Sequence, residues 1–222
     1  MRRELKFTLY ENEYGAFHWW LSHCFLSFRN NYPARVVNSV YLDTFDNRCV
    51  EDNISGASKR SKVRIRWYDD LCDTQEFRFE VKNKSNSFGW KMLEKARLSG
   101  VTEINSRIAI NRLIAGVREK LSPTARYYLD FFCNPTLLVE YKRQYFLSQC
   151  GNIRLTVDSN QVFRSLAAGC YPIPSKFADQ IVIEIKIDED VDSEWVAETL
   201  KDLPFRRTRN SKYINGIGSY FF

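Results

Sequence analysis

Basic side chains recur at every second position in two neighbouring segments of the sequence. Lys62, Arg64 and Arg66 are separated by single apolar residues, and acidic and basic residues alternate in the same way over 76–84. A period of two places such side chains on one face of a β-strand. Guanidinium and ammonium groups in a row neutralise and hydrogen-bond phosphate oxygens. The pattern therefore predicts a strand face suited to a polyanion, with a simple solvated face as the alternative.

The polar link 69–74 between these segments is short, which predicts a β-hairpin. Opposite the charged face, the hairpin carries Val63, Ile65, Phe77 and Phe79, which suit a hydrophobic core. The hairpin alone does not decide whether its charges face water or an interior.

Alternation of charged and apolar residues recurs elsewhere along the chain and brings the expected count to about eight strands, enough to close an antiparallel barrel. In most of these strands an acidic and a basic residue are two positions apart, which favours charged faces that point into the interior of the barrel. Buried charges are costly without partners, so such an interior would have to be wet and hold a polyanion. The further expected strands are 4–9, 35–44, 89–98, 136–149, 153–158 and 181–188.

Helical spacing of apolar residues separates these strands. Thr102 is expected to begin one helix as its N-cap. No linker divides the chain, so a single domain over 1–222 is predicted. The expected helices are 11–29, 101–121, 125–132 and 192–203, and the expected connections are 30–33, 47–58, 86–89, 169–174 and a basic tail over 206–213.

Composition restricts the class of protein and of ligand. Hydrophobic residues make up 44% and charged residues 27% of the 222, as in a globular domain, and a net charge of +6 favours anionic partners. Six cysteines without a CxxC pair and only two histidines argue against a zinc site. A charged N-terminus and the lack of a long apolar run argue against a signal peptide and a membrane span, so a reducing, cytoplasmic location is expected.

Several short motifs occur in a fixed order along nearly the whole chain. Each is common by chance, but the set is specific, and on it the sequence resembles the VTC domain. That domain is the polyphosphate-polymerase branch of the triphosphate tunnel metalloenzyme (CYTH-like) superfamily. The motifs are Arg2-x-Glu4-x-Lys6-Phe7, Tyr41-x-Asp43-Thr44, Arg60-x-Lys62-Val63-Arg64-Ile65-Arg66-x-Tyr68, Glu80-Val81-Lys82, Tyr141-Lys142-Arg143, Arg154-x-Thr156-x-Asp158, Glu184-x-Lys186 and Ser211-Lys212-Tyr213.

The resemblance implies an α+β fold, an eight-stranded antiparallel β-barrel with helices outside, whose tunnel holds a triphosphate or polyphosphate with Mn²⁺ or Mg²⁺. It implies Glu184, and more weakly Glu4, as metal ligands. The superfamily often opens with Glu-x-Glu-x-Lys, and Arg2 in place of the first glutamate puts a second metal in doubt. The implied catalytic residues are Arg64, Arg66, Lys82, Arg143 and Lys212. The implied phosphate-binding residues are Lys6, Arg64, Arg66, Lys82, Lys84, Lys91, Tyr141, Arg143, Arg154, Lys186, Ser211 and Lys212.

The implied reaction is transfer of the γ-phosphate of ATP, or of another nucleoside triphosphate, to a growing polyphosphate chain. A metal-dependent hydrolase on the same scaffold, or a non-catalytic module that binds polyphosphate or RNA, stays open. Nucleic acid is disfavoured, because the interleaved acids repel its backbone and Trp67, Phe77 and Phe79 lie opposite the basic faces. The acceptor, the preferred metal, the oligomeric state and the pathway are not determined by the sequence.

Overall fold

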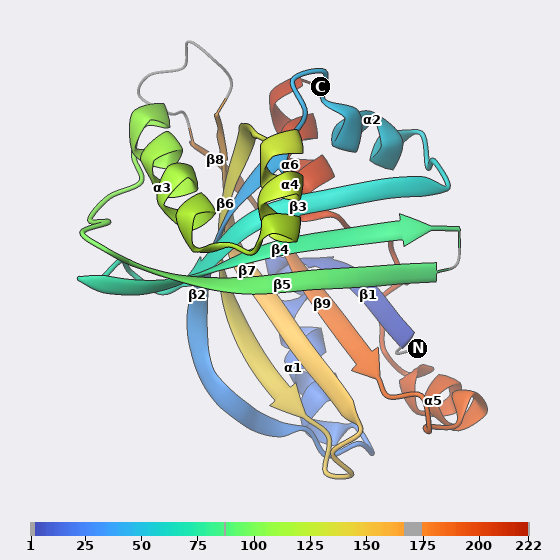
Figure 1. Ribbon diagram of the computed structural model, residues 1–222. Helices are drawn as coiled ribbons and strands as arrows, with labels where there is room; N and C mark the ends of the chain where they lie inside the picture. The colour runs from blue at the N-terminus through green and yellow to red at the C-terminus, as the bar shows by residue number, and fades with distance from the viewer. Residues whose placement is uncertain (1–2, 87, 167–174, 222) are drawn as a thin grey trace. The chain divides into compact units, whose positions relative to one another are not determined.

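The computed structural model describes residues 3–86, 88–166 and 175–221 (Figure 1). Over these ranges the chain forms nine strands and six α-helices, with hydrogen-bonded neighbours in the order β1-β9-β7-β6-β2-β3-β4-β5 and β8 paired to β7. Arg2, Ser87 and the expected loop 169–174 lie outside the described residues. Elements not introduced below are η1 (Glu11–Glu13), β6 (Asn134–Leu147) and β8 (Ser175–Ala178).

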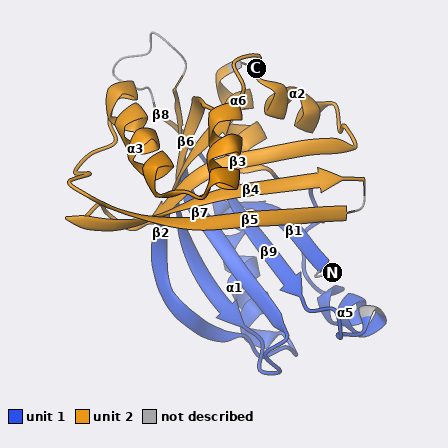
Figure 2. Ribbon diagram, in the orientation of Figure 1, with its two compact units in different colours: residues 1–36, 141–161, 177–210 blue, residues 37–140, 162–176, 211–222 orange. Residues whose placement is uncertain are grey.

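The chain divides into two compact units, each assembled from three segments (Figure 2). Unit 1 contains Met1–Val36, Tyr141–Gln161 and Phe177–Asn210, and unit 2 contains Val37–Glu140, Val162–Lys176 and Ser211–Phe222. The prediction of a single domain over 1–222 stays a prediction.

Unit 1 is built on the antiparallel strands β1 (Arg3–Tyr10), β9 (Gln180–Ile187) and the part of β7 (Ile153–Ser165) up to Gln161. In an antiparallel pair, residues directly opposite each other share a face. Lys6 is opposite Glu184, and Glu184 is opposite Thr156, so the charged residues of all three strands lie on one side.

The other side of these three strands forms the core of unit 1. Phe7, Leu155 and Ile183 are buried there together with Phe17 from α1 (Tyr14–His23) and Val196 from α5 (Ser193–Leu200). Removal of this much apolar surface from water is the main stabilising term available to the unit.

Unit 2 contains four antiparallel strands in the order β2 (Arg29–Asp43), β3 (Lys59–Tyr68), β4 (Thr74–Ser85) and β5 (Phe88–Ser99). Only the part of β2 from Val37 belongs to this unit. The hairpin and its third arm are therefore confirmed. The register puts the charged even-numbered residues of β3 and β4 on one face and Val63, Ile65, Phe77, Phe79 and Val81, all fully buried, on the other.

Two helices contact the apolar face of β5. The Leu98 side chain packs 3.1 Å from the Cβ position of Gly116 in α3 (Arg107–Lys120). The Glu94 carboxylate accepts hydrogen bonds from the backbone nitrogen and hydroxyl of Ser122, which caps α4 (Pro123–Phe131). The sheet itself thus separates the charged side of the hairpin from its core, as the alternation predicted.

Asp43 links two further helices of unit 2 to β2. Its buried carboxylate accepts hydrogen bonds from the backbone nitrogens of Cys49 and Val50 in α2 (Arg48–Ile54). It also accepts one from the hydroxyl of Tyr213, 2.7 Å away, in α6 (Lys212–Phe221). The negative charge of this carboxylate at the start of α2 also interacts favourably with the positive end of the helix dipole. Both helices therefore depend on a single buried acid.

Several boundaries differ from the sequence-based expectations. The first helix ends at His23, so residues 30–33 belong to β2 rather than to a turn, and Pro33 lies in the exposed first half of that strand. The expected connection 47–58 contains α2, and the basic tail leads into α6. The helix expected from 101 begins at Arg107, with Ser106 rather than Thr102 as its N-cap, because the Ser106 hydroxyl accepts a hydrogen bond from Ala109 N.

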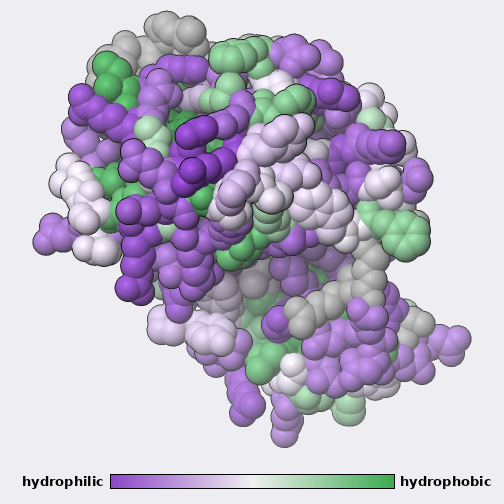
Figure 3. All heavy atoms as spheres, in the orientation of Figure 1, coloured by the Kyte–Doolittle hydropathy of each residue, from purple (hydrophilic) through white to green (hydrophobic). Residues whose placement is uncertain are grey.

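The face seen in Figure 3 is largely hydrophilic, with small hydrophobic patches. Within the described ranges, no helix has the length and apolar character needed to cross a membrane. Cys24, Cys49, Cys72, Cys133 and Cys150 are free thiols, of which only Cys24 and Cys49 are buried.

Gly216→Ala is expected to destabilise unit 2, because α6 has no room for a methyl group there. A Cβ atom at this position would lie 2.5 Å from Leu137 Cδ2 and 2.9 Å from Phe163 Cδ1. Overpacking of this kind costs about 1–3 kcal/mol of unfolding free energy. Gly15→Ala in α1 is the matched control, since a Cβ there meets nothing within 4 Å. Thermal melts of both variants test this, and equal melting temperatures for Gly216→Ala and wild type would contradict it.

Candidate active site

The charged side of β3, β4 and β5 in unit 2 has a large excess of bases, and we call it the arginine face. Like charges lie directly opposite each other across the strands, for example Lys62 opposite Lys82 and Lys82 opposite Lys91. Such pairs are destabilising by themselves. Its bases are Arg60, Lys62, Arg64, Arg66, Arg78, Lys82, Lys84, Lys91, Lys95 and Arg97, and its acids are Glu76 and Glu80.

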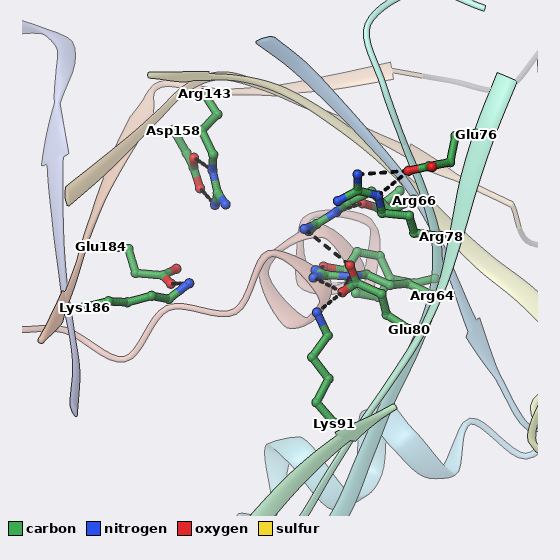
Figure 4. A network of polar contacts seen from close by, with 12 residues as sticks. Arg64, Arg66, Glu76, Arg78, Glu80, Lys91, Arg143, Asp158, Glu184 and Lys186 are labelled. Atoms are coloured by element: carbon green, nitrogen blue, oxygen red, sulfur yellow. Dashed lines mark hydrogen bonds and ion pairs between the residues drawn. The ribbon is translucent and has the colours of Figure 1, made fainter. Parts of the chain in front are cut away.

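Glu80 gathers three of these bases (Figure 4). Its carboxylate lies 2.6 Å from Arg64 Nη2, 3.2 Å from Lys91 Nζ and 3.8 Å from Arg66 Nη1. The residue is only 4% exposed. Burial acts to raise the pKa of Glu80, but the positive charges of Arg64, Arg66 and Lys91 outweigh it and lower the pKa to about 2. Glu80 therefore stays ionised and holds the three cations together.

Arg66 is the most enclosed base of this group, with 7% of its surface exposed. Its Nε donates a hydrogen bond to Ser39 Oγ at 3.4 Å. Next to it, burial acts to raise the pKa of Tyr41, while the charges of Arg64, Arg66 and Lys212 outweigh that effect and lower it. The local electrostatic potential is thus positive enough to favour an anion.

The lysines of the arginine face differ in their surroundings. Lys91 is half-exposed and paired with Glu80, and burial together with the nearby arginines lowers its pKa despite that pairing. Lys82 and Lys84 are exposed, and neither forms an ion pair with another residue of the described chain. Lys82 therefore faces two lysines across the strands without an acidic partner of its own.

Ser211 and Lys212 reach this face from the start of α6. The Lys62 ammonium donates a hydrogen bond to Ser211 Oγ at 2.8 Å. One residue further on, the ring of Tyr213 stacks on Tyr41, with centroids 4.9 Å apart. The Tyr41 hydroxyl in turn lies 3.3 Å from Arg64 Nη1. The stacked tyrosines thus fix the beginning of α6 beside the arginines.

The charged side of β1, β9 and β7 in unit 1 is more balanced, and we call it the carboxylate face. Glu184 lies 2.7 Å from Lys186 and 3.8 Å from Lys6, and Lys6 lies 3.0 Å from Glu4 (Figure 4 shows the Glu184–Lys186 pair). Burial acts to raise the pKa of Glu184, but the charges of Lys186, Lys6 and Arg143 lower it overall. Two carboxylates therefore flank one lysine.

Arg143 belongs to the same face of unit 1. Its guanidinium forms a bidentate pair with the fully buried Asp158, at 2.5 and 2.7 Å, and lies 5.3 Å from the ring centre of Tyr141. Although burial acts against the charged form, Tyr141, Asp158 and Glu184 raise the pKa of Arg143. Arg154 pairs instead with Asp188 at 2.9 Å.

The residues of the carboxylate face fit a divalent cation that arrives with phosphate. No cluster of three or more His, Cys, Asp or Glu side chains occurs in the described part of the chain, so the protein offers no complete cage of its own. Mg²⁺ is commonly held by one or two carboxylates, with substrate phosphates and water completing its shell. Glu4 and Glu184 supply that number, and the buried Thr156 hydroxyl, opposite Glu184, has no hydrogen-bond partner among the described residues.

The structure adds residues that the sequence did not single out as site residues. Glu80 and Asp158 organise the arginines of their units, and Tyr213 positions α6. Alternation alone placed Glu80 and Asp158 on the charged faces, but their partners come from other strands. No pattern in the sequence indicated the contact of Tyr213 with Asp43, which lies 170 positions away.

Comparison with known proteins decides the family. The family model described as the VTC domain matches residues 1–221. The chain belongs to the VTC domain family. No match to this VTC domain occurs among curated proteins.

An X-ray structure of a candidate adenylate cyclase from Vibrio parahaemolyticus is similar to this VTC domain, with a TM-score of 0.53 and 11% sequence identity. The similarity covers 98% of this chain and 97% of that chain, and at this identity it shows the fold alone. The predicted family and fold class, an α+β fold of the triphosphate tunnel type on an antiparallel sheet, are confirmed. Membership of this family, together with this fold, indicates a triphosphate-acting enzyme.

The lowered pKa of Glu80 predicts an acid-labile arginine face. Because the pKa of Glu80 is lower in the folded than in the unfolded state, its ionised carboxylate stabilises the fold. This contribution to the free energy of unfolding is fully present above the unfolded-state pKa of 4.5 and is lost as the pH falls toward about 2. A shift of this size corresponds to on the order of 3 kcal/mol. Urea unfolding between pH 2 and 7 is expected to show this loss, and Glu80→Gln should reduce it. The exposed Glu119→Gln variant is the control, and an identical pH slope in all three proteins would refute the prediction.

Proposed function

We propose that this VTC domain transfers the γ-phosphoryl group of ATP, or of another nucleoside triphosphate, to the end of an inorganic polyphosphate chain. The observation that carries the proposal is the row of like charges on the arginine face. Bases held opposite bases across three strands are costly until an anion neutralises them. A chain of phosphates supplies the row of negative charges that these bases lack.

The proposed reaction needs positioning and charge neutralisation more than it needs a nucleophile from the protein. A terminal oxygen of the polyphosphate attacks the γ-phosphorus, the bond from that phosphorus to the β-bridging oxygen breaks, and ADP leaves. Arg64, Arg66, Lys82 and Lys212 of unit 2 neutralise charge on the phosphoryl oxygens. Arg143 of unit 1 is proposed as a further catalytic phosphate contact, as the family resemblance implies. No acid or base is required if the attacking oxygen is already ionised.

The supporting residues have graded roles in this proposal. Lys91 and Lys186 are each held by a carboxylate, so they bind phosphate by exchanging or sharing that partner. Lys84, which is exposed, and Arg154, which pairs with Asp188, contact the chain away from the reacting phosphates. Tyr141 contributes through Arg143, whose guanidinium lies over its ring. Lys6 and Ser211 complete the phosphate-binding set.

Mn²⁺ or Mg²⁺ is the proposed cofactor, with Glu184 and more weakly Glu4 as its protein ligands. When bound, a divalent cation supplies charge neutralisation between adjacent phosphates. Displacement of Lys6 and Lys186 toward phosphate oxygens would release the carboxylates for this purpose. Thr156 is an additional candidate ligand because its hydroxyl is buried and has no hydrogen-bond partner in the described part of the chain.

Product analysis tests the proposed reaction. The purified chain is incubated with ATP and Mn²⁺ or Mg²⁺, with and without a short polyphosphate primer, and the products are resolved on a gel stained for polyphosphate. We expect long chains, with one ADP formed for each phosphate that is added to them. Free phosphate without chains would contradict the proposal and support the hydrolase. The absence of both products would support a module that only binds polyphosphate.

A further inference from the structure

A groove of about 430 Å³ lies in unit 2 between α2, α4 and one end of the strands β3, β4 and β5. Ser61, Asn83 and Trp90 line it. Asn83 is directly opposite both Ser61 and Trp90, and its position puts these side chains on the face away from Arg64 and Glu80. The groove therefore lies at the end of the sheet, where Arg60 and Lys84 of the arginine face also reach it, and away from Arg64 and Glu80.

One wall of the groove is basic. It contains Arg48 of α2, Lys59 and Arg60 of β3, and Lys84 of β4. The acidic lining residue is Asp52, whose Oδ2 lies 4.0 Å from Arg48 Nε. Four bases less one acid leave an excess of three positive charges. Arg60 is also directly opposite Lys84, and within the described chain Lys59 and Lys84 have no ion-pair partner, so this wall favours an anion.

The other wall is aromatic. It contains Trp90 and, from α4 and its C-terminal end, Tyr128, Phe131 and Phe132. Trp90 is 49% exposed and Phe131 47%, and the Trp90 and Tyr128 rings meet edge to face with centroids 5.8 Å apart. Exposed large aromatic side chains gathered at a concave surface mark a binding site. Their ring faces suit the stacking of a planar heterocycle.

We propose that this groove is a nucleotide-binding site. The phosphate group lies on the basic wall, and the base stacks on Trp90. The amide of Asn83 and the hydroxyl of Ser61, which are hydrogen-bonded to each other, supply polar groups for the edge of the base. A bare phosphate would leave the aromatic wall unused, and a neutral aromatic compound would leave the basic wall uncompensated. The groove volume is within the ordinary range for small-molecule sites.

AMP is the probe, because it has a base and a phosphate but no triphosphate. Its binding is measured by calorimetry at low salt in the wild type and in Trp90→Ala, Lys59→Ser and Trp19→Ala variants. Trp19, in α1 of unit 1, is 66% exposed and serves as the matched control. We expect Trp90→Ala and Lys59→Ser each to weaken AMP binding at least tenfold, with Trp19→Ala unchanged. Thermal melts confirm that each variant is folded.

Two further measurements distinguish the groove from the arginine face and from a nonspecific anion site. AMP should bind the Arg66→Ala variant as it binds the wild type, and ribose 5-phosphate should bind at least tenfold more weakly than AMP. Loss of AMP binding in Arg66→Ala would assign it to the arginine face. Equal binding of ribose 5-phosphate would show a simple anion patch. No saturable AMP binding, or tight binding of single-stranded RNA alone, would overturn the proposal, whatever the outcome for polyphosphate synthesis.

Discussion

Arg66→Ala is expected to lower the rate of polyphosphate synthesis by about 100-fold or more, with the fold preserved. Removal of one preorganised donor from a developing oxyanion commonly costs this much. Arg66 is nearly buried on the arginine face, and its contacts include a long pair with Glu80 and a hydrogen bond to Ser39. Steady-state kinetics with ATP and a polyphosphate primer measure the effect.

The stability of this variant is expected to be near that of the wild type or above it. Glu80 keeps Arg64 and Lys91 as partners, and Arg78, directly opposite Arg66, loses a like-charged neighbour. Arg118→Ala is the matched control, because Arg118 is an exposed arginine of the same unit that pairs with Asp130. A fall in melting temperature that parallels the loss of activity would show Arg66 to be structural instead.

Glu184→Gln is expected to raise the Mn²⁺ or Mg²⁺ concentration for half-maximal activity by about tenfold or more, or to eliminate activity. The substitution preserves the shape of the side chain but removes its charge, and hard divalent cations require anionic oxygen ligands. Binding of polyphosphate without metal should be retained, because Lys6 and Lys186 lose the carboxylate that competes for them.

Activity titrated with each metal, together with calorimetry in the presence of a chelator, measures both quantities. Glu198→Gln in α5 of the same unit is the control, since that carboxylate is exposed and pairs only with its helical neighbour Lys201 among the described residues. Unchanged metal dependence with activity retained in Glu184→Gln would reduce Glu184 to a structural partner of Lys186.

The faces of the strands were predictable from the sequence because a period of two is a local property. Arg64, Glu80 and Lys186 lie on the charged faces, and Val63 and Phe79 on the buried ones, as the alternation predicted. Lys91 also lies on the charged face although Leu93 shares its parity, because Leu93 is opposite Glu80. Pattern alone had left that third arm ambiguous.

Two helices were not predictable in this way. Residues 212–221 contain two glycines, and the helix α6 that they form is held by a distant acid, Asp43, through Tyr213. α2 is short and mostly polar, and the same Asp43 caps its beginning. Contacts between residues far apart in the chain leave no local periodicity, so residues 47–58 were expected to be a connection and residues 206–213 a tail.

The candidate site was predictable in its residue types but not in its pairings. The motifs supplied the bases and Glu184, whereas the grouping of Arg64, Arg66 and Lys91 around Glu80 depends on the register of three strands. The same holds for the pairing of Arg143 with Asp158. The assigned roles in phosphate and metal binding stay predictions.

The most direct test of the proposed function follows the γ-phosphate itself. The chain is incubated with Mn²⁺ or Mg²⁺ and a polyphosphate primer, and ATP labelled at either the γ- or the α-phosphorus. The products are separated by length on a gel. We expect γ-label in chains longer than the primer and α-label in ADP alone, with both patterns lost in Arg66→Ala. Chains without γ-label, or γ-label confined to free phosphate, would contradict the proposed transfer.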